Sequence, residues 1–224
     1  MEKLELNEIE NKLEYVFKNK TFLETAFSHS SYANTHHIAS NERLEFLGDS
    51  LLNFITTDFL YSNFSESEGE LSKIKAYLVS AENLSAIIEQ MDILKFLHCG
   101  NFNPNSSKNV KCDLFEAILG AIYKDSDFNT AKKFVIKKLQ LTKQHVLTQM
   151  QNIVDYKSKL QEFVQISGKN DIEYRMIGKQ GKANCPEFEI ELLIGRQVIS
   201  SSKASSKKQA ENLCAKLALE KLQK

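Results

Sequence analysis

The sequence predicts an all-α domain followed by a small α+β domain of order α-β-β-β-α. Apolar residues recur at helical spacing over roughly the first two thirds of the chain, whereas strict alternation of apolar and polar residues begins at residue 172. The charge balance changes between the same two parts: residues 1–156 hold 16 Lys and Arg against 21 Asp and Glu, and residues 157–224 hold 13 against 8. A chain of 224 residues has room for two modest domains, which we place at 3–148 and 154–224.

The composition excludes several classes of protein. No apolar run approaches the ~18 residues of a membrane span, and the N-terminus lacks the pattern of a signal peptide, so we expect a soluble cytoplasmic protein. The net charge of zero sums an acidic part of −5 and a basic part of +5, so it does not exclude nucleic acid as a partner. None of the cysteines forms a C-x-x-C pair, and we expect reduced thiols instead of a disulfide or a zinc site. They are Cys99, Cys112, Cys185 and Cys214.

The N-terminal segment is predicted to be helical. Apolar residues at helical spacing indicate one helix over Leu4–Phe17 and another over Phe22–Phe27, ahead of a polar loop at 33–40. His29 stands two residues before Ser31, between the second helix and the loop. We interpret His29 as a structural residue, since a lone histidine in such a place is more often structural than a ligand.

A long helix is expected from about residue 41 to residue 61, where Leu and Ile recur at helical spacing and Ser40 or Asn41 can cap the first turn. Glu42, Glu45 and Asp49 then fall within about 60° of one another on a different flank. Like charges so placed repel by roughly a few tenths of a kcal/mol per pair, and burial would add a desolvation cost. A divalent cation would offset this repulsion; a solvated acidic face is the alternative.

A second helix carries two more carboxylates. Asp113 and Glu116 are three residues apart in a segment whose apolar spacing also predicts a helix. Each acidic helix has an interior glycine, Gly48 or Gly120, where glycine costs roughly 1 kcal/mol relative to alanine. We infer that the two helices approach closely at these glycines. This would gather Glu45, Asp49, Asp113 and Glu116 around one point. Oxygen donors without His or Cys favour Mg²⁺, or Mn²⁺ as a substitute, over zinc.

The other helices bring the expected total in the first domain to about seven. A polar turn at 65–72, in which Glu68 precedes a glycine, leads into one of them. Others are expected at Leu84–Gln90 and Thr130–Val146, and the helix with Asp113 should end near Asp125. A di-iron oxidase also holds its metals among helical carboxylates, but it needs Glu-x-x-His pairs, and none accompanies these acids.

The C-terminal part changes pattern. We expect a helix at 158–166, strands at 172–176, 187–192 and 197–201, and a helix from residue 205 or 206 onward. Gly195 would turn the chain between the last two strands, and Ser206 with Gln209 has the form of a capping box. Lys207 and Lys208 then occupy a first helical turn, whose free N–H groups attract phosphate. A lysine pair alone is usually only a solvated face.

Two stretches in the first domain resemble the ribonuclease III family. Residues 42–50, Glu-Arg-Leu-Glu-Phe-Leu-Gly-Asp-Ser, are similar to the family signature, and Asp113-x-x-Glu116-Ala117 is similar to its second carboxylate motif. The resemblance covers nearly the whole chain. It implies a homodimeric endonuclease that hydrolyses both strands of double-stranded RNA with Mg²⁺, each subunit cutting one strand and leaving 5′-phosphate and 3′-hydroxyl ends. It further implies roles in rRNA precursor and mRNA processing.

The resemblance also implies roles for single residues. Asp49 and Glu116 would be catalytic as well as metal ligands, with Glu42 and Glu68 as supporting acids. Phe46, which lies off the apolar stripe, would sit in the dimer interface, ordinary core packing being the alternative. The four carboxylates would hold Mg²⁺, whose bound water attacks phosphorus in line. Either one or two metal ions could occupy each site.

The C-terminal pattern resembles the double-stranded-RNA-binding domain, which reads A-form RNA across two minor grooves. By this resemblance the RNA-binding residues are Gln161, Glu162, Ala183, Asn184, Lys203, Lys207 and Lys208. Two departures are visible: Asn184 stands where the family usually has His, and Ser202-Lys203-Ala204 replaces a glycine-rich approach to the last helix. A protein that binds double-stranded RNA without cutting it is the alternative function, which loss of one of the four carboxylates would have favoured; none is lost.

Overall fold

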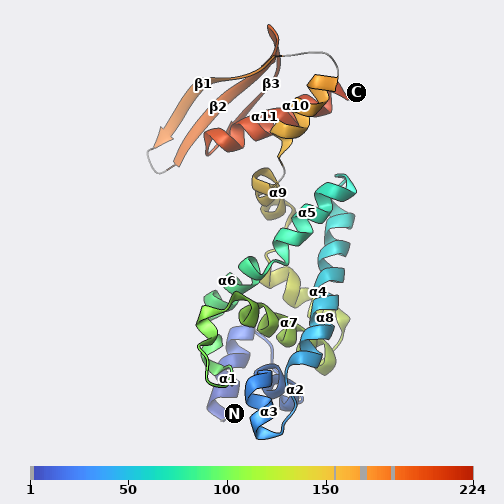
Figure 1. The fold of residues 1–224 in the computed structure, drawn as a ribbon, viewed down its shortest axis with the longest axis vertical. Coiled ribbons are helices and arrows are strands. Elements are labelled where there is room, and N and C mark those ends of the chain that lie inside the picture. The colour runs from blue at the N-terminus through green and yellow to red at the C-terminus, as the bar shows by residue number, and fades with distance from the viewer. Residues whose placement is uncertain (1–2, 154, 167–170, 183–184, 224) are drawn as a thin grey trace. The chain divides into compact units, whose positions relative to one another are not determined.

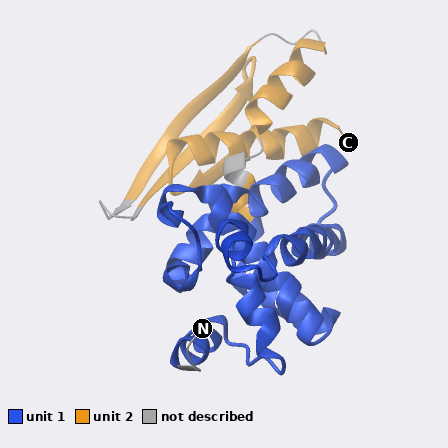
Figure 2. Ribbon diagram, turned by 60° about the horizontal axis from the view of Figure 1, so that its bottom comes forward, with its two compact units in different colours: residues 1–146 blue, residues 147–224 orange. Residues whose placement is uncertain are grey.

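The computed structural model describes residues 3–153, 155–166, 171–182 and 185–223 (Figure 1). The chain divides into two compact units, Met1–Val146 and Leu147–Lys224 (Figure 2). The first is helical and the second combines a sheet with helices, so the predicted fold class is confirmed. Among the described residues, no helix is both long and apolar enough to cross a membrane.

Nine α-helices and two short 3-10 turns begin within residues 3–146, more than the seven helices expected. They are α1 (Lys3–Leu13), α2 (Lys20–Ala26), α3 (Ser30–His36), α4 (Glu42–Asn63), α5 (Glu68–Leu78), α6 (Ala81–Met91), η1 (Leu94–Phe96), η2 (Pro104–Ser106), α7 (Lys108–Asp125), α8 (Phe128–Lys138) and α9 (Lys143–Ile153).

Left-handed residues explain two of the differences from the expected helices. The first helix ends at Leu13 instead of Phe17 because Glu14 has φ 59°. The segment expected as one helix over Thr130–Val146 is split into α8 and α9, with Gln140 at φ 49° between them. A residue in the left-handed conformation ends a helix. Neither position holds a glycine, the residue type that would have predicted a helix end there. The expected loop at 33–40 is also shorter, since α3 extends to His36.

The predicted cap of α4 is wrong. Asn41 occupies the N-cap position, but its backbone is helical and its side chain makes no capping hydrogen bond. It is buried, and its carbonyl oxygen accepts from the N–H groups of Leu44 and Glu45, both at 2.9 Å. Ser40 Oγ donates instead to Glu42 Oε2 at 3.1 Å. Tertiary burial has replaced the local capping pattern at this helix start.

Helix α7 lies in the middle of the first unit and packs against α4 (Figure 1). Every residue from Leu114 to Ile122 is buried. A Cβ added to Gly48 would lie 1.8 Å from the carbonyl oxygen of Glu116, and one added to Gly120 would lie 2.2 Å from that of Leu44. The two backbones are therefore in direct contact, and the close approach inferred from the two interior glycines is confirmed.

The second unit consists of α10 (Tyr156–Ile166), β1 (Ile172–Lys182), β2 (Cys185–Ile194), β3 (Gln197–Ala204) and α11 (Lys207–Leu222). The strands form an antiparallel sheet in the order β1-β2-β3, and both helices pack against one of its faces (Figure 1). Gly195, at φ 62°, turns β2 into β3 as predicted. The strands are longer than expected, and β1 extends to Lys182 instead of ending near residue 176.

Candidate active site

Two packed helices supply the carboxylates that the sequence singled out. Asp113 and Glu116 stand on α7, and Glu45 and Asp49 stand on α4 on either side of Gly48, which contacts the backbone of Glu116. Glu116 is 9% exposed, Glu45 and Asp113 are half-buried, and Asp49 is exposed. Asn53 Nδ2 donates to Asp49 Oδ1 at 2.7 Å and holds this carboxylate from the next helical turn.

These carboxylates perturb one another. Burial, the charge of Asp49 and then those of Asp113 and Glu45 raise the pKa of Glu116 to about 7. Burial, followed by the charge of Asp113, raises the pKa of Glu45. Burial also raises the pKa of Asp113, which the nearby charge of His29 offsets in part. Among the ion pairs of the described residues, none includes any of the four carboxylates, so apart from the nearby charge of His29 the negative charge at this helix crossing is not neutralised by an ion pair.

Cys112 joins the two carboxylates of α7. Its sulfur lies 3.5 Å from Glu116 Oε1, and one ligand atom from each of Cys112, Asp113 and Glu116 lies within 4.8 Å of the others. Neither Glu45 nor Asp49 is part of this close group. Cys112 is not among the site residues predicted from the sequence. Its spacing of four residues from Glu116, which places both on one face of a helix, is the signal that could have found it.

His29 has a structural role at the start of a helix, which supports the structural interpretation. His29 is the N-cap of α3, where its Nδ1 accepts from the backbone N–H of Ser31 at 3.1 Å. The Ser31 hydroxyl lies 2.8 Å from the same nitrogen and accepts from the N–H of Gly100, also at 2.8 Å. These bonds attach α3 to the segment that leads toward α7.

The residues predicted to bind RNA in the second unit lie at its surface as far as they are described. Gln161 and Glu162 are exposed on α10. Lys203 pairs with Glu189 at 3.4 Å and Lys207 with Glu211 at 3.8 Å, whereas Lys208 is exposed and makes no ion pair within the described range. Ser206 caps α11 by accepting from the N–H of Gln209 at 3.2 Å, as predicted. Ala183 and Asn184 lie outside the described residues.

Family models match both units. Residues 19–143 match the model described as ribonuclease-III-like, and residues 156–222 match the double-stranded RNA binding motif. The chain belongs to the ribonuclease III family. As a member of this family it is an endoribonuclease that acts on double-stranded RNA.

Full-length relatives agree with this assignment. The chain is 39% identical to ribonuclease 3 of Borreliella afzelii over 99% of this chain and 93% of that protein, and 36% identical to ribonuclease 3 of Streptococcus thermophilus over 97% and 99%. The solved nuclease domain of ribonuclease III from Campylobacter jejuni matches with a TM-score of 0.56 at 31% identity, covering 60% of this chain and 96% of that one.

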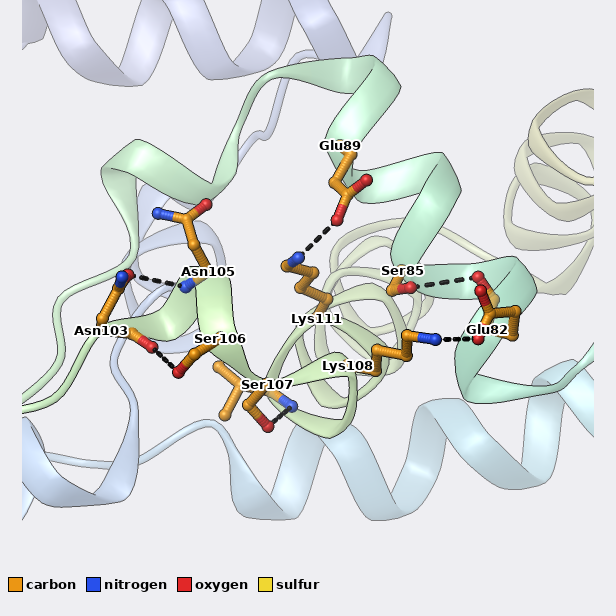
Figure 3. Close-up of polar contacts among 10 residues, drawn as sticks. Glu82, Ser85, Glu89, Asn103, Asn105, Ser106, Ser107, Lys108 and Lys111 are labelled. Atoms are coloured by element: carbon orange, nitrogen blue, oxygen red, sulfur yellow. Dashed lines mark hydrogen bonds and ion pairs between the residues drawn. The ribbon is translucent and has the colours of Figure 1, made fainter.

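In this ribonuclease III chain, two ion pairs attach the start of helix α7 to α6 (Figure 3). Lys108 pairs with Glu82, and the buried Lys111 pairs with Glu89. Ser107 caps the helix by accepting from the N–H of Val110 at 3.4 Å. The turn that leads to Asp113 is therefore held from outside the carboxylate cluster.

The structure separates the remaining predicted site residues from that cluster. Glu42 is exposed in the first turn of α4, where its charge contributes to the raised pKa of Glu45. Glu68 begins α5 and accepts from Ser72 Oγ at 2.7 Å. The 18 residues of α4 that follow Glu45 span about 27 Å, so Glu68 does not join the cluster of its own chain. Phe46 is 78% exposed, which excludes core packing within the chain.

Proposed function

We propose that this ribonuclease III hydrolyses both strands of double-stranded RNA with Mg²⁺ and leaves 5′-phosphate and 3′-hydroxyl ends. The metal ligands would be Glu45, Asp49, Asp113 and Glu116. One observation carries the proposal: carboxylates from α4 and α7 meet at a helix crossing where none of them forms an ion pair within the described residues, and one of them, Glu116, is buried. Burying an unpaired carboxylate costs free energy, and a cation bound at the site would reduce this cost.

The donor set fits a hard divalent ion. Four carboxylates offer oxygen atoms only, which suits Mg²⁺ and allows Mn²⁺ as a substitute. A divalent ion bound there would supply Lewis-acid catalysis and lower the pKa of a coordinated water. Asp49 and Glu116 are the proposed catalytic ligands. Asn53 orients Asp49, and the buried helix α7 fixes Glu116, so neither carboxylate has to be ordered when RNA arrives.

We assign RNA binding to the second unit and place the domains at 3–148 and 154–224. Exposed Gln161 and Glu162 would face 2′-hydroxyls of a minor groove, and Ala183 and Asn184 would enter the next one. Lys203, Lys207 and Lys208 would take phosphates. Support comes from the matched RNA-binding motif and from the capped start of α11, where free N–H groups and lysines coincide.

Exposed aromatic residues on one side of α4 support a homodimer. Phe46, Phe54 and Tyr61 are 78%, 59% and 81% exposed, and their helical positions fall within about 80° of one another. A two-fold axis beside residues 53 and 54 would pair two copies of α4 antiparallel, so that Phe46 of one subunit meets Tyr61 of the other. Tyr61 lines a hollow of about 620 Å³ between α4 and α5, whose walls combine apolar residues such as Leu60 and Leu71 with polar and charged ones. We propose that Phe46 fills it.

The same pairing gives Glu68 a role across the dimer. Residues that pair across this axis have numbers that sum to 107, so the chain just beyond the end of α4 would approach Glu42 of the other subunit. Glu68 begins α5 four residues after Phe64, which ends α4. We propose that Glu68 and Glu42 are supporting acids contributed by different subunits.

We also propose that the enzyme acts in the cytoplasm on rRNA precursors and mRNA. The test of the function is incubation of the purified protein with a long, perfectly paired RNA, with Mg²⁺ and then with Ca²⁺ in its place. Short duplex products with 5′-phosphates that appear only with Mg²⁺ are expected. An RNA that is shifted on a native gel but uncut with both ions would instead identify a binding protein that does not cleave.

A further inference from the structure

We propose that Cys112, Asp113 and Glu116 form a binding site for thiophilic divalent ions, Zn²⁺ and Cd²⁺, and that its occupation inhibits the enzyme. The binding site rests on the geometry of α7. The inhibition rests on the proposed function, because it requires that Asp113 and Glu116 also hold the catalytic ion.

The three donors are already close to the arrangement that such an ion needs. A tetrahedral zinc with bonds of about 2.3 Å to sulfur and 2.1 Å to oxygen requires neighbouring donor atoms about 3.4–3.6 Å apart. Cys112 Sγ lies 3.5 Å from Glu116 Oε1, and the three ligand atoms lie within 4.8 Å of one another. The sulfur and the Glu116 oxygen are thus already at the separation that the ion requires, and a ligand atom of Asp113 lies within 4.8 Å of both.

The burial of Glu116 favours a cation at this position, whichever divalent ion binds. Its side chain is about nine-tenths buried, and none of the lysine, arginine or histidine side chains in the described segments pairs with it. Its one hydrogen-bond partner there is the Cys112 thiol, which belongs to the same cluster. An ion bound between the sulfur and this carboxylate would satisfy the buried charge.

The Cys112 sulfur makes the site selective for thiophilic metal ions over Mg²⁺. Mg²⁺ takes oxygen ligands and gains nothing from Cys112, whereas Zn²⁺ and Cd²⁺ favour thiolate. On binding, the thiol proton is released to the buffer and the sulfur coordinates as thiolate. Asp113 and Glu116 cannot serve both ions, so binding of the thiophilic ion and of Mg²⁺ is mutually exclusive.

The other described thiols lack such a setting. Cys99 has the carbonyl oxygen of Phe102 at 3.8 Å, and Cys214 is buried against Ser202 Oγ at 3.1 Å and the carbonyl oxygen of Ile190 at 3.2 Å. Neither is grouped with carboxylates in the described parts of the chain. Cys99, which is also a free, half-buried thiol of the first unit, therefore provides a matched control.

The binding test uses the full-length, RNA-free protein freed of metal and titrated with Cd²⁺, whose thiolate complex absorbs in the ultraviolet by charge transfer. Wild type and Cys99→Ser should develop this absorption with one ion per chain, and excess Mg²⁺ should reverse it. Cys112→Ser and Cys112→Ala should lose the absorption and bind Cd²⁺ more weakly by on the order of tenfold or more. Unchanged absorption and affinity in both Cys112 variants, with folding verified by circular dichroism, would overturn the proposal.

The inhibition test measures cleavage of double-stranded RNA in Mg²⁺ with increasing Zn²⁺, each variant being scaled to its own activity without Zn²⁺. The half-inhibitory Zn²⁺ concentration should rise about tenfold or more in Cys112→Ser and stay at the wild-type value in Cys99→Ser. Equal sensitivity of the two variants would refute the inhibitory role. Failure of the wild type to cleave in Mg²⁺ alone would refute the proposed function and leave the Cd²⁺ titration to decide the site.

Discussion

Replacing Glu116 by Gln should stabilise the metal-free enzyme while abolishing cleavage. The carboxyl and the amide have nearly the same size, so the substitution removes the charge and leaves the packing of α7 in place. In the folded protein the pKa of Glu116 rises from the ordinary 4.5 to about 7, chiefly because the group is buried. Its ionised form is therefore less favourable in the folded chain than in the unfolded one.

The size and sign of the effect follow from this pKa. The shift from 4.5 to about 7 corresponds to at most about 3.5 kcal/mol, at roughly 1.4 kcal/mol per pKa unit. Because the pKa is raised for an acid, the penalty is absent below pH 4.5, grows between pH 4.5 and about 7, and is complete above that. Rearrangement of the neighbouring carboxylates will relieve part of it, so we expect Glu116→Gln to gain about 1–3 kcal/mol at pH 8 and almost nothing at pH 4.5.

Urea unfolding followed by circular dichroism in the presence of a chelator measures this difference. Glu82→Gln is the control, since it removes an exposed carboxylate from the same unit; it should cost no more than about 1 kcal/mol. Mg²⁺ should stabilise the wild type more than it stabilises Glu116→Gln. A Glu116→Gln protein that is less stable than the wild type at pH 8 without metal would refute the view that this carboxylate is held under electrostatic strain.

Three further substitutions test the helix crossing, the dimer and the RNA contacts. Gly48→Ala should destabilise the first unit by about 3 kcal/mol or more because its Cβ would strike the Glu116 carbonyl, whereas Gly69→Ala, with nothing within 4 Å, should be neutral or stabilising in the same unfolding assay. Equal effects would refute the close approach. Phe46→Asp should yield monomers by sedimentation and lose double-strand cleavage, while Leu4→Asp, at 79% exposure, should remain dimeric; a dimeric Phe46→Asp protein would contradict the proposed interface. Lys208→Ala should weaken RNA binding regardless of sequence and reduce the salt slope of log affinity by about 1; an unchanged slope would remove Lys208 from the phosphate contacts.

The parts of the fold that sequence predicted well are those in which a local pattern has a local cause. Apolar spacing placed α4 and α7, because an amphipathic helix must bury its stripe whatever else surrounds it. The glycines at 48 and 120 predicted the helix contact. Glycine inside a helix lowers its stability, and here it is required because the backbones of α4 and α7 touch at these positions. The alternating residues of the second unit located the strands for the same kind of reason.

The parts that sequence did not predict depend on tertiary context. Asn41 has the residue type of a cap, but its burial imposes a helical backbone. Gln140 follows α8 in the left-handed conformation, which glutamine rarely adopts and which its residue type therefore does not predict. The contact of Cys112 with Glu116 follows from their four-residue spacing on α7, whereas composition alone suggested an ordinary core thiol. Apolar spacing placed Phe46 off the buried stripe of α4, but it could not predict that no other part of the described chain covers Phe46.

Binding of Mn²⁺ to the metal-free, RNA-free enzyme, measured by the loss of its free paramagnetic resonance signal, tests the four-carboxylate site most directly. The wild type should bind Mn²⁺, and Glu45→Gln, Asp49→Asn, Asp113→Asn and Glu116→Gln should each lose on the order of tenfold or more in affinity. The same variants should still bind double-stranded RNA, because the proposed contacts lie on the other unit. Variants that bind Mn²⁺ as tightly as the wild type would contradict the proposal that these four carboxylates hold the catalytic ion.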